Sequence, residues 1–171
     1  MSETDQTDRC GLTGLFNYRK LQADLASALQ DSEPVTFILA DLDDFKRVND
    51  TYGHEVGDSV LCTVASTMAG TCAASRSCLG PYRLGGEAFC AILTNVDADL
   101  AMEFADTLRV GVEQIRIDGY AELRVTARLA VVTTPADGDA VSRQEHLLSA
   151  AHGVVYCHPD DKKHNAVVGV A

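Results

Sequence analysis

Apolar positions over much of the chain recur every three or four residues, which is the spacing of amphipathic helices. Leu21, Leu25 and Leu29 form the first such stripe. Asp97 is predicted to cap a later helix with the stripe Leu100, Phe104, Leu108 and Val112, because a short acidic side chain accepts hydrogen bonds from free N–H groups. The pattern predicts helices over residues 17–30, about 44–52, 97–112 and 142–157. A further helix is predicted from about residue 58 to the start of a loop at 70–77.

Five other segments carry strand patterns. The nearly continuous apolar run at 35–40 predicts a central strand that is buried on both faces. The runs at 78–84 and 89–93 flank Gly85-Gly86, and this predicts a tight hairpin because glycine adopts the positive φ of such turns. Residues 123–131 alternate with a period of two, and residues 165–170 form a short last strand. Helices and strands together predict an α/β (α+β) fold, a mixed sheet with helices packed on it.

Two acidic residues are predicted at the ends of strands. Asp41 directly follows the central strand, and Glu87 follows the paired glycines at the tip of the hairpin. Carboxylates on neighbouring strand ends supply the oxygen ligands that hard divalent cations prefer. The sequence therefore predicts that Asp41 and Glu87 come together. Ala88 is expected to be exposed at the same tip, where a substitution costs little stability, within about 0.5 kcal/mol.

Composition limits the class of protein. The 171 residues predict a disordered leader at 1–10 and one domain at 11–171. The net charge of −11 argues against a nucleic-acid or anionic-membrane surface, since both need clustered basic charge. The sequence contains no apolar run long enough to span a bilayer and no signal peptide, which predicts a cytoplasmic protein. The six cysteines contain no CxxC pair, which favours reduced thiols over a zinc site or a disulfide framework.

Three motifs give the chain a resemblance to a known family. They are Leu12-Thr13-Gly14-Leu15-Phe16-Asn17, the block from Asp41-Leu42-Asp43-Asp44-Phe45-Lys46 through Asn49 to Gly57-Asp58, and Arg83-Leu84-Gly85-Gly86-Glu87-Ala88-Phe89. Through them the chain resembles the GGDEF domain of the diguanylate cyclase family, from residue 11 to about 168. The resemblance implies a central mixed, largely antiparallel five-stranded sheet wrapped by helices, as in nucleotide cyclases and polymerase palm domains.

The resemblance also implies a reaction and a site. The family joins two GTP molecules into cyclic di-GMP, with one GTP on each subunit of a transient antiparallel homodimer. It implies Asp41 and Glu87 as catalytic residues, which with the Leu42 carbonyl would bind Mg²⁺ (or Mn²⁺). The implied substrate-binding residues are Asp44, Phe45 and Lys46 for the phosphates, and Asn49 and Asp58 for guanine.

Several of these residues have a structural interpretation as well. Asp58 could cap a helix, Asn49 could close a turn, and Lys46 could be a solvated charge. Asp43 is interpreted as an exposed acid without a role. Glu87 could be a hairpin acid without a ligand.

The chain departs from the family pattern at three places. Ala88 replaces the fourth residue of the signature, normally glutamate, and this removes a carboxylate from the metal site. Pro159 stands where a phosphate-binding lysine is expected, with Lys162 or Lys163 as candidate replacements. The product-inhibition motif retains Arg76 but has Leu79 in place of aspartate.

Three functions are therefore considered. The first is a weakly active diguanylate cyclase. The second is a catalytically inactive, GTP-sensing module that controls an EAL phosphodiesterase domain, in the same chain or in a partner. The third is a dimerisation domain without a ligand, and the retained Asp41, Asn49, Asp58 and Glu87 argue against it.

Overall fold

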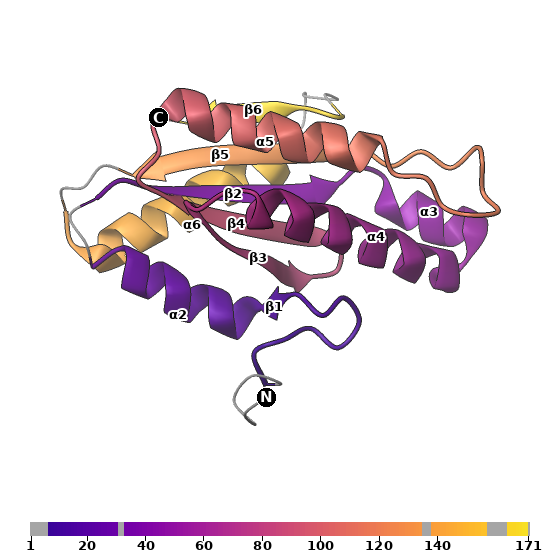
Figure 1. Ribbon diagram of the computed structural model, residues 1–171, viewed down its shortest axis with the longest axis horizontal. Helices are drawn as coiled ribbons and strands as arrows, with labels where there is room; N and C mark the ends of the chain where they lie inside the picture. Colours follow the sequence, from indigo (N-terminus) through magenta and orange to yellow (C-terminus); the bar gives the residue numbers. More distant parts are fainter. Residues whose placement is uncertain (1–6, 31–32, 135–137, 157–163, 171) are drawn as a thin grey trace.

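The computed structural model describes residues 7–30, 33–134, 138–156 and 164–170. A sheet of six strands forms its middle layer, in the order β1-β3-β4-β2-β5-β6 (Figure 1). Its strands are β1 (Phe16–Asn17), β2 (Val35–Leu42), β3 (Cys78–Gly85), β4 (Ala88–Thr94), β5 (Ala127–Thr134) and β6 (Val167–Val170). The central strand β2 is antiparallel to β4 and β5, whereas the edge strands β1 and β6 are parallel to β3 and β5.

The predicted fold class is confirmed, but the predicted number of strands is one too small. The additional strand, β1, has two residues, which is too short for a hydrophobic period to reveal. Its pairing with Tyr82 and Arg83 of β3 is a contact between segments that are far apart in the sequence.

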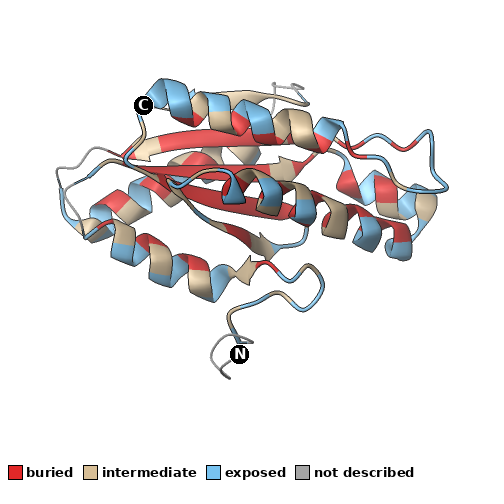
Figure 2. Cartoon of the chain, in the orientation of Figure 1, coloured by how far each residue is buried: buried red, intermediate tan, exposed pale blue. Residues whose placement is uncertain are grey.

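Helices cover both faces of the sheet (Figures 1 and 2). They are α2 (Tyr18–Ala28), α3 (Phe45–Tyr52), α4 (His54–Ala73), α5 (Ala98–Glu113) and α6 (Ala140–Tyr156). One apolar cluster lies between the sheet and the layer of α3, α4 and α5, and a second lies under α2 and α6. Strand β2 contributes to both, because successive side chains of a strand point to opposite faces: Ile38 belongs to the first cluster and Phe37 to the second.

Several predicted boundaries are corrected by the structure. Helix α4 begins at His54 and continues to Ala73, through part of the loop predicted at 70–77. Strand β5 begins at Ala127 rather than at residue 123, because Ala127 is the last residue paired with β2 and the chain before it extends beyond the sheet. Leu123 and Val125 are nevertheless buried, which explains their period of two.

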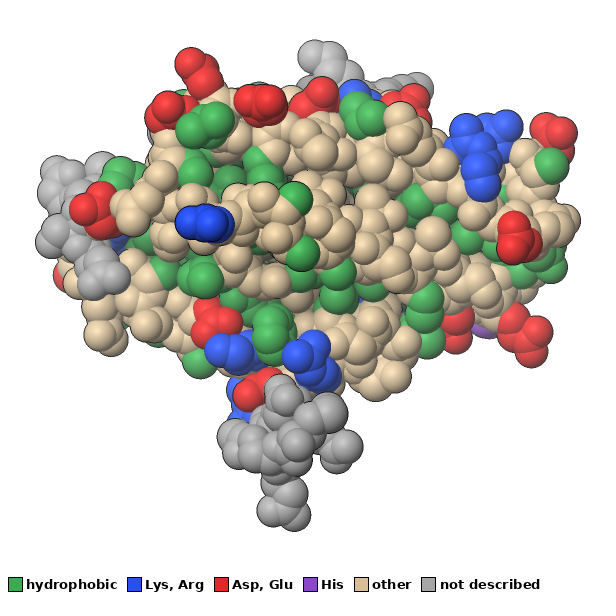
Figure 3. Space-filling view, in the orientation of Figure 1, with side chains coloured by type: hydrophobic (Ala, Val, Ile, Leu, Met, Phe, Trp, Pro, Cys, Tyr) green, Lys and Arg blue, Asp and Glu red, His purple; other side chains and the backbone are tan. Residues whose placement is uncertain are grey.

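The cap of helix α5 is confirmed, but its apolar stripe is shifted. The Asp97 side chain accepts a hydrogen bond from the Leu100 backbone N–H at 2.8 Å. Leu100 itself is 53% exposed, and the buried stripe is Ala101, Ala105, Leu108 and Val112. Acidic side chains gather along the edge of the molecule that α5 forms (Figure 3), where Asp99, Glu103, Asp106 and Glu113 are exposed.

The described chain starts inside the predicted leader. The Asn17 N–H donates to the Asp8 carbonyl and the Cys10 N–H donates to the Leu15 carbonyl, both at 2.8 Å. Residues 7–10 are therefore tied to the start of the sheet, while residues 1–6 lie outside the described residues. Within the described part of the chain, no helix combines the length and the apolar character that crossing a membrane requires.

Candidate active site

The ends of β2 and of the β3–β4 hairpin meet at one edge of the sheet. The register places Asp41 directly opposite Ala88, and the Leu42 N–H donates to the Glu87 carbonyl at 3.4 Å. Gly86 has a φ of 55°, a conformation that glycine adopts without strain, and its carbonyl accepts a hydrogen bond from Arg83 at 2.8 Å. The structure therefore brings Asp41 and Glu87 together as predicted.

Asp41 lies in an unusual electrostatic environment. Burial raises its pKa to about 6, a hydrogen bond from the Tyr156 hydroxyl at 3.1 Å opposes this shift, and the charges of Glu87 and Asp43 raise the pKa further. A divalent cation between Asp41 and Glu87 would remove that repulsion. The two carboxylates and the backbone oxygens beside them are hard ligands, which fit Mg²⁺ or Mn²⁺.

The donor set at this edge is small. Among the residues that the structure describes, no three side chains of His, Cys, Asp or Glu are grouped so that they could hold a metal ion. A cation bound here would therefore need ligands besides Asp41 and Glu87. The Leu42 carbonyl, phosphate oxygens of a substrate and water can supply them.

The loop after Asp41 opens toward the same space. Asp44 has a left-handed backbone with a φ of 52° and directly precedes helix α3, and no side chain caps the first turn of that helix. Uncapped N–H groups at a helix start bind anions such as phosphate. A cavity of about 260 Å³ is bordered by both carboxylates and by this loop; its walls include Asp41, Leu42, Asp43, Asp44, Phe45, Lys46, Glu87, Arg128 and His164.

The two residues implied for guanine lie outside that cavity, on adjacent helices. Asn49 is on α3, and Asp58 is an exposed residue of α4 that directly follows Gly57. A Cβ atom on Gly57 would lie 1.9 Å from the Asn49 amide oxygen, so the Asn49 amide can occupy this position only because residue 57 has no side chain. Asp58 lies inside α4 and is not its cap, and Gly53 rather than Asp58 precedes the helix.

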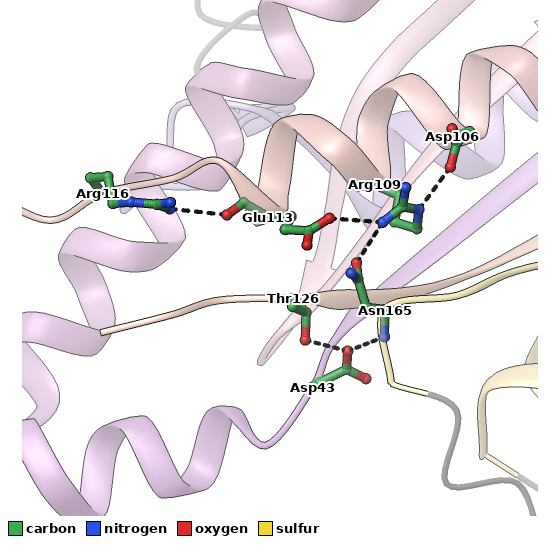
Figure 4. A network of polar contacts seen from close by, with 7 residues as sticks. All are labelled: Asp43, Asp106, Arg109, Glu113, Arg116, Thr126 and Asn165. Carbon is green, nitrogen blue, oxygen red and sulfur yellow. Dashed lines mark hydrogen bonds and ion pairs between the residues drawn. The ribbon is translucent and has the colours of Figure 1, made fainter. Parts of the chain in front are cut away.

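The interpretation of Asp43 as an exposed acid is wrong. Its side chain is partly buried, and Oδ2 accepts hydrogen bonds from the Thr126 hydroxyl at 2.7 Å and from the Asn165 backbone N–H at 2.8 Å (Figure 4). The sequence marked Asp43 only by its place two residues after Asp41. Thr126, Asn165 and Tyr156 carried no signal, because their contacts join segments that are far apart in the chain.

The expectation for Ala88 is also wrong. Pairing with β2 continues through this residue, so Ala88 is only 7% exposed and lies on the same face of the sheet as Asp41. It borders a mostly apolar cavity of about 440 Å³ together with Tyr18, Phe37, Leu39, Leu84, Leu148, His152 and Tyr156. Position 88 is therefore a strand position directly beside Asp41.

The other two departures have different outcomes. Arg76 is exposed and Leu79 is 38% exposed, so the residues of the inhibition motif are at the surface. Pro159, Lys162 and Lys163 lie outside the described residues. The chain is described again from His164, whose Nδ1 atom lies 3.8 Å from Asp44 Oδ2.

The sequence is similar to those of known proteins. The family model "Diguanylate cyclase, GGDEF domain" matches residues 7–165. The chain belongs to the GGDEF family. Diguanylate cyclase VdcA of Vibrio cholerae serotype O1 is 31% identical to this GGDEF domain over 149 residues, which cover 85% of this chain and 42% of VdcA. Response regulator PleD of Caulobacter vibrioides is 34% identical over 178 aligned positions, which cover 100% of this chain and 37% of PleD.

Solved structures support the same assignment. The GGDEF domain of TpbB (YfiN) from Pseudomonas aeruginosa matches with a TM-score of 0.81 and 25% identity, over 94% of this chain and 93% of that one. The chain thus spans less than half the length of the two curated relatives, but nearly all of a solved GGDEF domain.

Proposed function

We propose that this GGDEF domain binds GTP with Mg²⁺ (or Mn²⁺) and is a diguanylate cyclase of low activity. One observation carries the proposal: Asp41, Glu87 and the uncapped start of α3 border the same cavity. The two carboxylates that could bind a metal and the backbone N–H groups that could bind phosphate are therefore both within reach of one nucleotide. Four acidic side chains and only two cationic ones, Lys46 and Arg128, border this cavity, so a bound divalent cation would offset the repulsion of a triphosphate.

The residues take separate parts in this proposal. Asp41, Glu87 and the Leu42 carbonyl would hold the metal, which would supply positive charge to neutralise the phosphates. In the proposed reaction the 3′-hydroxyl of one GTP gives up its proton and attacks the α-phosphate of the other, and pyrophosphate leaves. The backbone at Asp44 and Phe45 and the Lys46 side chain bind the phosphates. Two such reactions between two bound GTP molecules give cyclic di-GMP, which requires two copies of the domain in an antiparallel homodimer.

Guanine would be bound between α3 and α4. An aspartate at position 58 accepts hydrogen bonds from the guanine N1–H and N2–H₂ groups, and the Asn49 amide complements the remaining polar atoms. The contact between Asn49 and Gly57, the neighbour of Asp58, supports a common binding surface. Adenine presents a different pattern of donors, so this surface favours GTP over ATP.

The low activity is inferred from Ala88. A carboxylate at that strand position would lie directly opposite Asp41, whereas the alanine supplies no ligand. The same observation favours a second candidate, a GTP-sensing module without catalysis that controls an EAL phosphodiesterase domain in the same chain or in a partner.

One experiment separates these functions. The purified protein is incubated with GTP and Mg²⁺ or Mn²⁺ and assayed for cyclic di-GMP and pyrophosphate, while calorimetry compares GTP with ATP. Asp41→Ala should weaken metal-dependent binding strongly, and Asp50→Ala, an exposed acid on α3, is the matched control of equal charge. Binding with product supports the cyclase, and binding without product supports the sensor. Equal binding of ATP, or an Asp41→Ala variant that binds like the wild type, contradicts the proposed site.

A further inference from the structure

Asp43 lies between the proposed metal ligand Asp41 and the proposed phosphate loop, but its own contacts lead elsewhere. Its Oδ2 atom accepts two hydrogen bonds, from the Thr126 hydroxyl and from the Asn165 backbone N–H (Figure 4). The backbone N–H of Asp43 also donates to the Thr126 carbonyl at 2.9 Å. Asp43 therefore ties the end of β2 to the segments that lead into β5 and β6.

Asn165 is held from two sides. Asp43 binds its backbone, and Arg109 of α5 donates a hydrogen bond to its side-chain oxygen at 3.0 Å (Figure 4). Arg109 is itself fixed by Asp106 at 2.7 Å and by Glu113 at 2.9 Å. Asn165 has a left-handed backbone with a φ of 55°. This conformation is unfavourable for residues other than glycine, and the surrounding hydrogen bonds hold it in place.

The tether acts on the nucleotide site through its neighbours in the chain. Asp44, the next residue after Asp43, has a left-handed backbone and directly precedes α3, so its orientation depends on how Asp43 is held. On the other side, His164 precedes Asn165 and lies beside Asp44 in the wall of the 260 Å³ cavity. A shift of Asp43 would move both walls of the cavity relative to Asp41.

We propose that Asp43 is a positioning residue of the nucleotide site, which needs an acceptor oxygen at Oδ2 to hold the phosphate loop and Asn165 together. The predicted effect of Asp43 on nucleotide binding rests on the function proposed above. The competing role is a direct metal ligand, which requires the negative charge. Asparagine distinguishes the two roles, because its amide oxygen accepts the same two hydrogen bonds but is a much poorer metal ligand.

The first measurement is nucleotide affinity, with Mn²⁺ and GTP in calorimetry of the full chain. Asp43→Ala should raise the Kd about tenfold or more, the usual effect of losing an outer group of a metal site. Asp43→Asn should stay within about threefold of the wild type. Glu122→Ala is the matched control, because Glu122 is an exposed acid near Asp43 for which the described residues show no hydrogen bond. An Asp43→Asn variant as weak as Asp43→Ala would overturn the proposal in favour of a metal ligand.

The second measurement needs no ligand. Amide exchange of Asn165, followed by NMR, should accelerate in Asp43→Ala and remain slow in Asp43→Asn. If Asp43→Ala does not fold, Thr126→Val keeps the carboxylate and deletes one donor, and should shift the Asn165 amide resonance. Unchanged Asn165 protection in Asp43→Ala would overturn the tether. If the wild type binds no GTP, the proposed function fails, and the amide data alone decide whether Asp43 positions this loop.

Discussion

The sharpest prediction concerns the restoration of a carboxylate at residue 88. In Ala88→Glu the new side chain projects from a paired strand position, on the face where Asp41 lies directly opposite. The cavity of about 440 Å³ that Ala88 borders offers space for the added atoms. The backbone therefore needs no rearrangement, and the change isolates one carboxylate.

The magnitude follows from the strand geometry. Side chains directly opposite in an antiparallel pair have Cβ atoms about 5 Å apart. If the two carboxylates lie about as far apart as these Cβ atoms, they repel by roughly 3 kcal/mol at an effective dielectric constant of about 20, before further screening by solvent. Because the pKa of Asp41 is already raised, Ala88→Glu should clearly destabilise the metal-free protein at neutral pH, beyond the 0.5 kcal/mol expected for an exposed alanine.

A bound cation reverses this cost. With Mg²⁺ the two carboxylates become ligands of one ion, so we expect affinity for Mg²⁺ and synthesis of cyclic di-GMP each to rise at least about tenfold. Thermal melting with and without Mg²⁺, Mn²⁺ titration and a chromatographic assay of cyclic di-GMP measure the three effects. Ala88→Gln is the control, because it adds nearly the same volume without charge and should show neither the destabilisation nor the gain.

One result would refute this reasoning. If Ala88→Glu folds and binds GTP but gains neither Mg²⁺ affinity nor product, the missing carboxylate is not what limits turnover. The defect would then lie at the segment around Pro159, where added basic residues near Asp161 and Lys162 should restore activity. A flat response to both changes identifies a non-catalytic nucleotide sensor.

Three other predictions concern pH, guanine and product. Burial raises the pKa of Asp41 to about 6 in the folded protein, whereas in the unfolded chain this pKa has its ordinary value of 3.8. The folded state therefore holds a proton that the unfolded chain has released, and the stability of the metal-free protein falls as pH rises from about 4 to about 6. Urea denaturation at several pH values should show that Asp41→Asn removes this slope. Gly57→Ala should displace the Asn49 amide and reduce the preference for GTP over ATP about tenfold in calorimetry, the cost of one lost hydrogen bond. Arg76→Ala should leave cyclic di-GMP binding unchanged, because the Leu79 side chain cannot accept a hydrogen bond from guanine.

Each of these has an outcome that contradicts it. A pH slope that persists in Asp41→Asn assigns the proton to another group. Gly70→Ala is the control for Gly57→Ala, since an added Cβ there meets nothing within 4 Å, and equal nucleotide preference in both variants removes Asn49 from the guanine site. Micromolar cyclic di-GMP binding that Arg76→Ala abolishes restores the inhibitory site.

The local features of this protein were determined by sequence alone. The hairpin followed from Gly85-Gly86, because positive φ angles are a property of single residues. The buried strand β2 and the cap at Asp97 followed from hydrophobic pattern and short-range hydrogen bonding. The meeting of Asp41 and Glu87 was also predictable, since both lie at strand ends that the family motif places side by side.

The surroundings of those residues were decided only by the tertiary structure. Ala88 is buried rather than exposed because the register with β2 extends to the end of the hairpin. Asp43 is hydrogen-bonded to Thr126 and Asn165, which lie 83 and 122 positions further along the chain. Asp41 is hydrogen-bonded to Tyr156, which lies 115 positions away. A periodic pattern reports which face of a segment is apolar, but a polar side chain finds its partners through the pairing of distant segments, which no local pattern encodes.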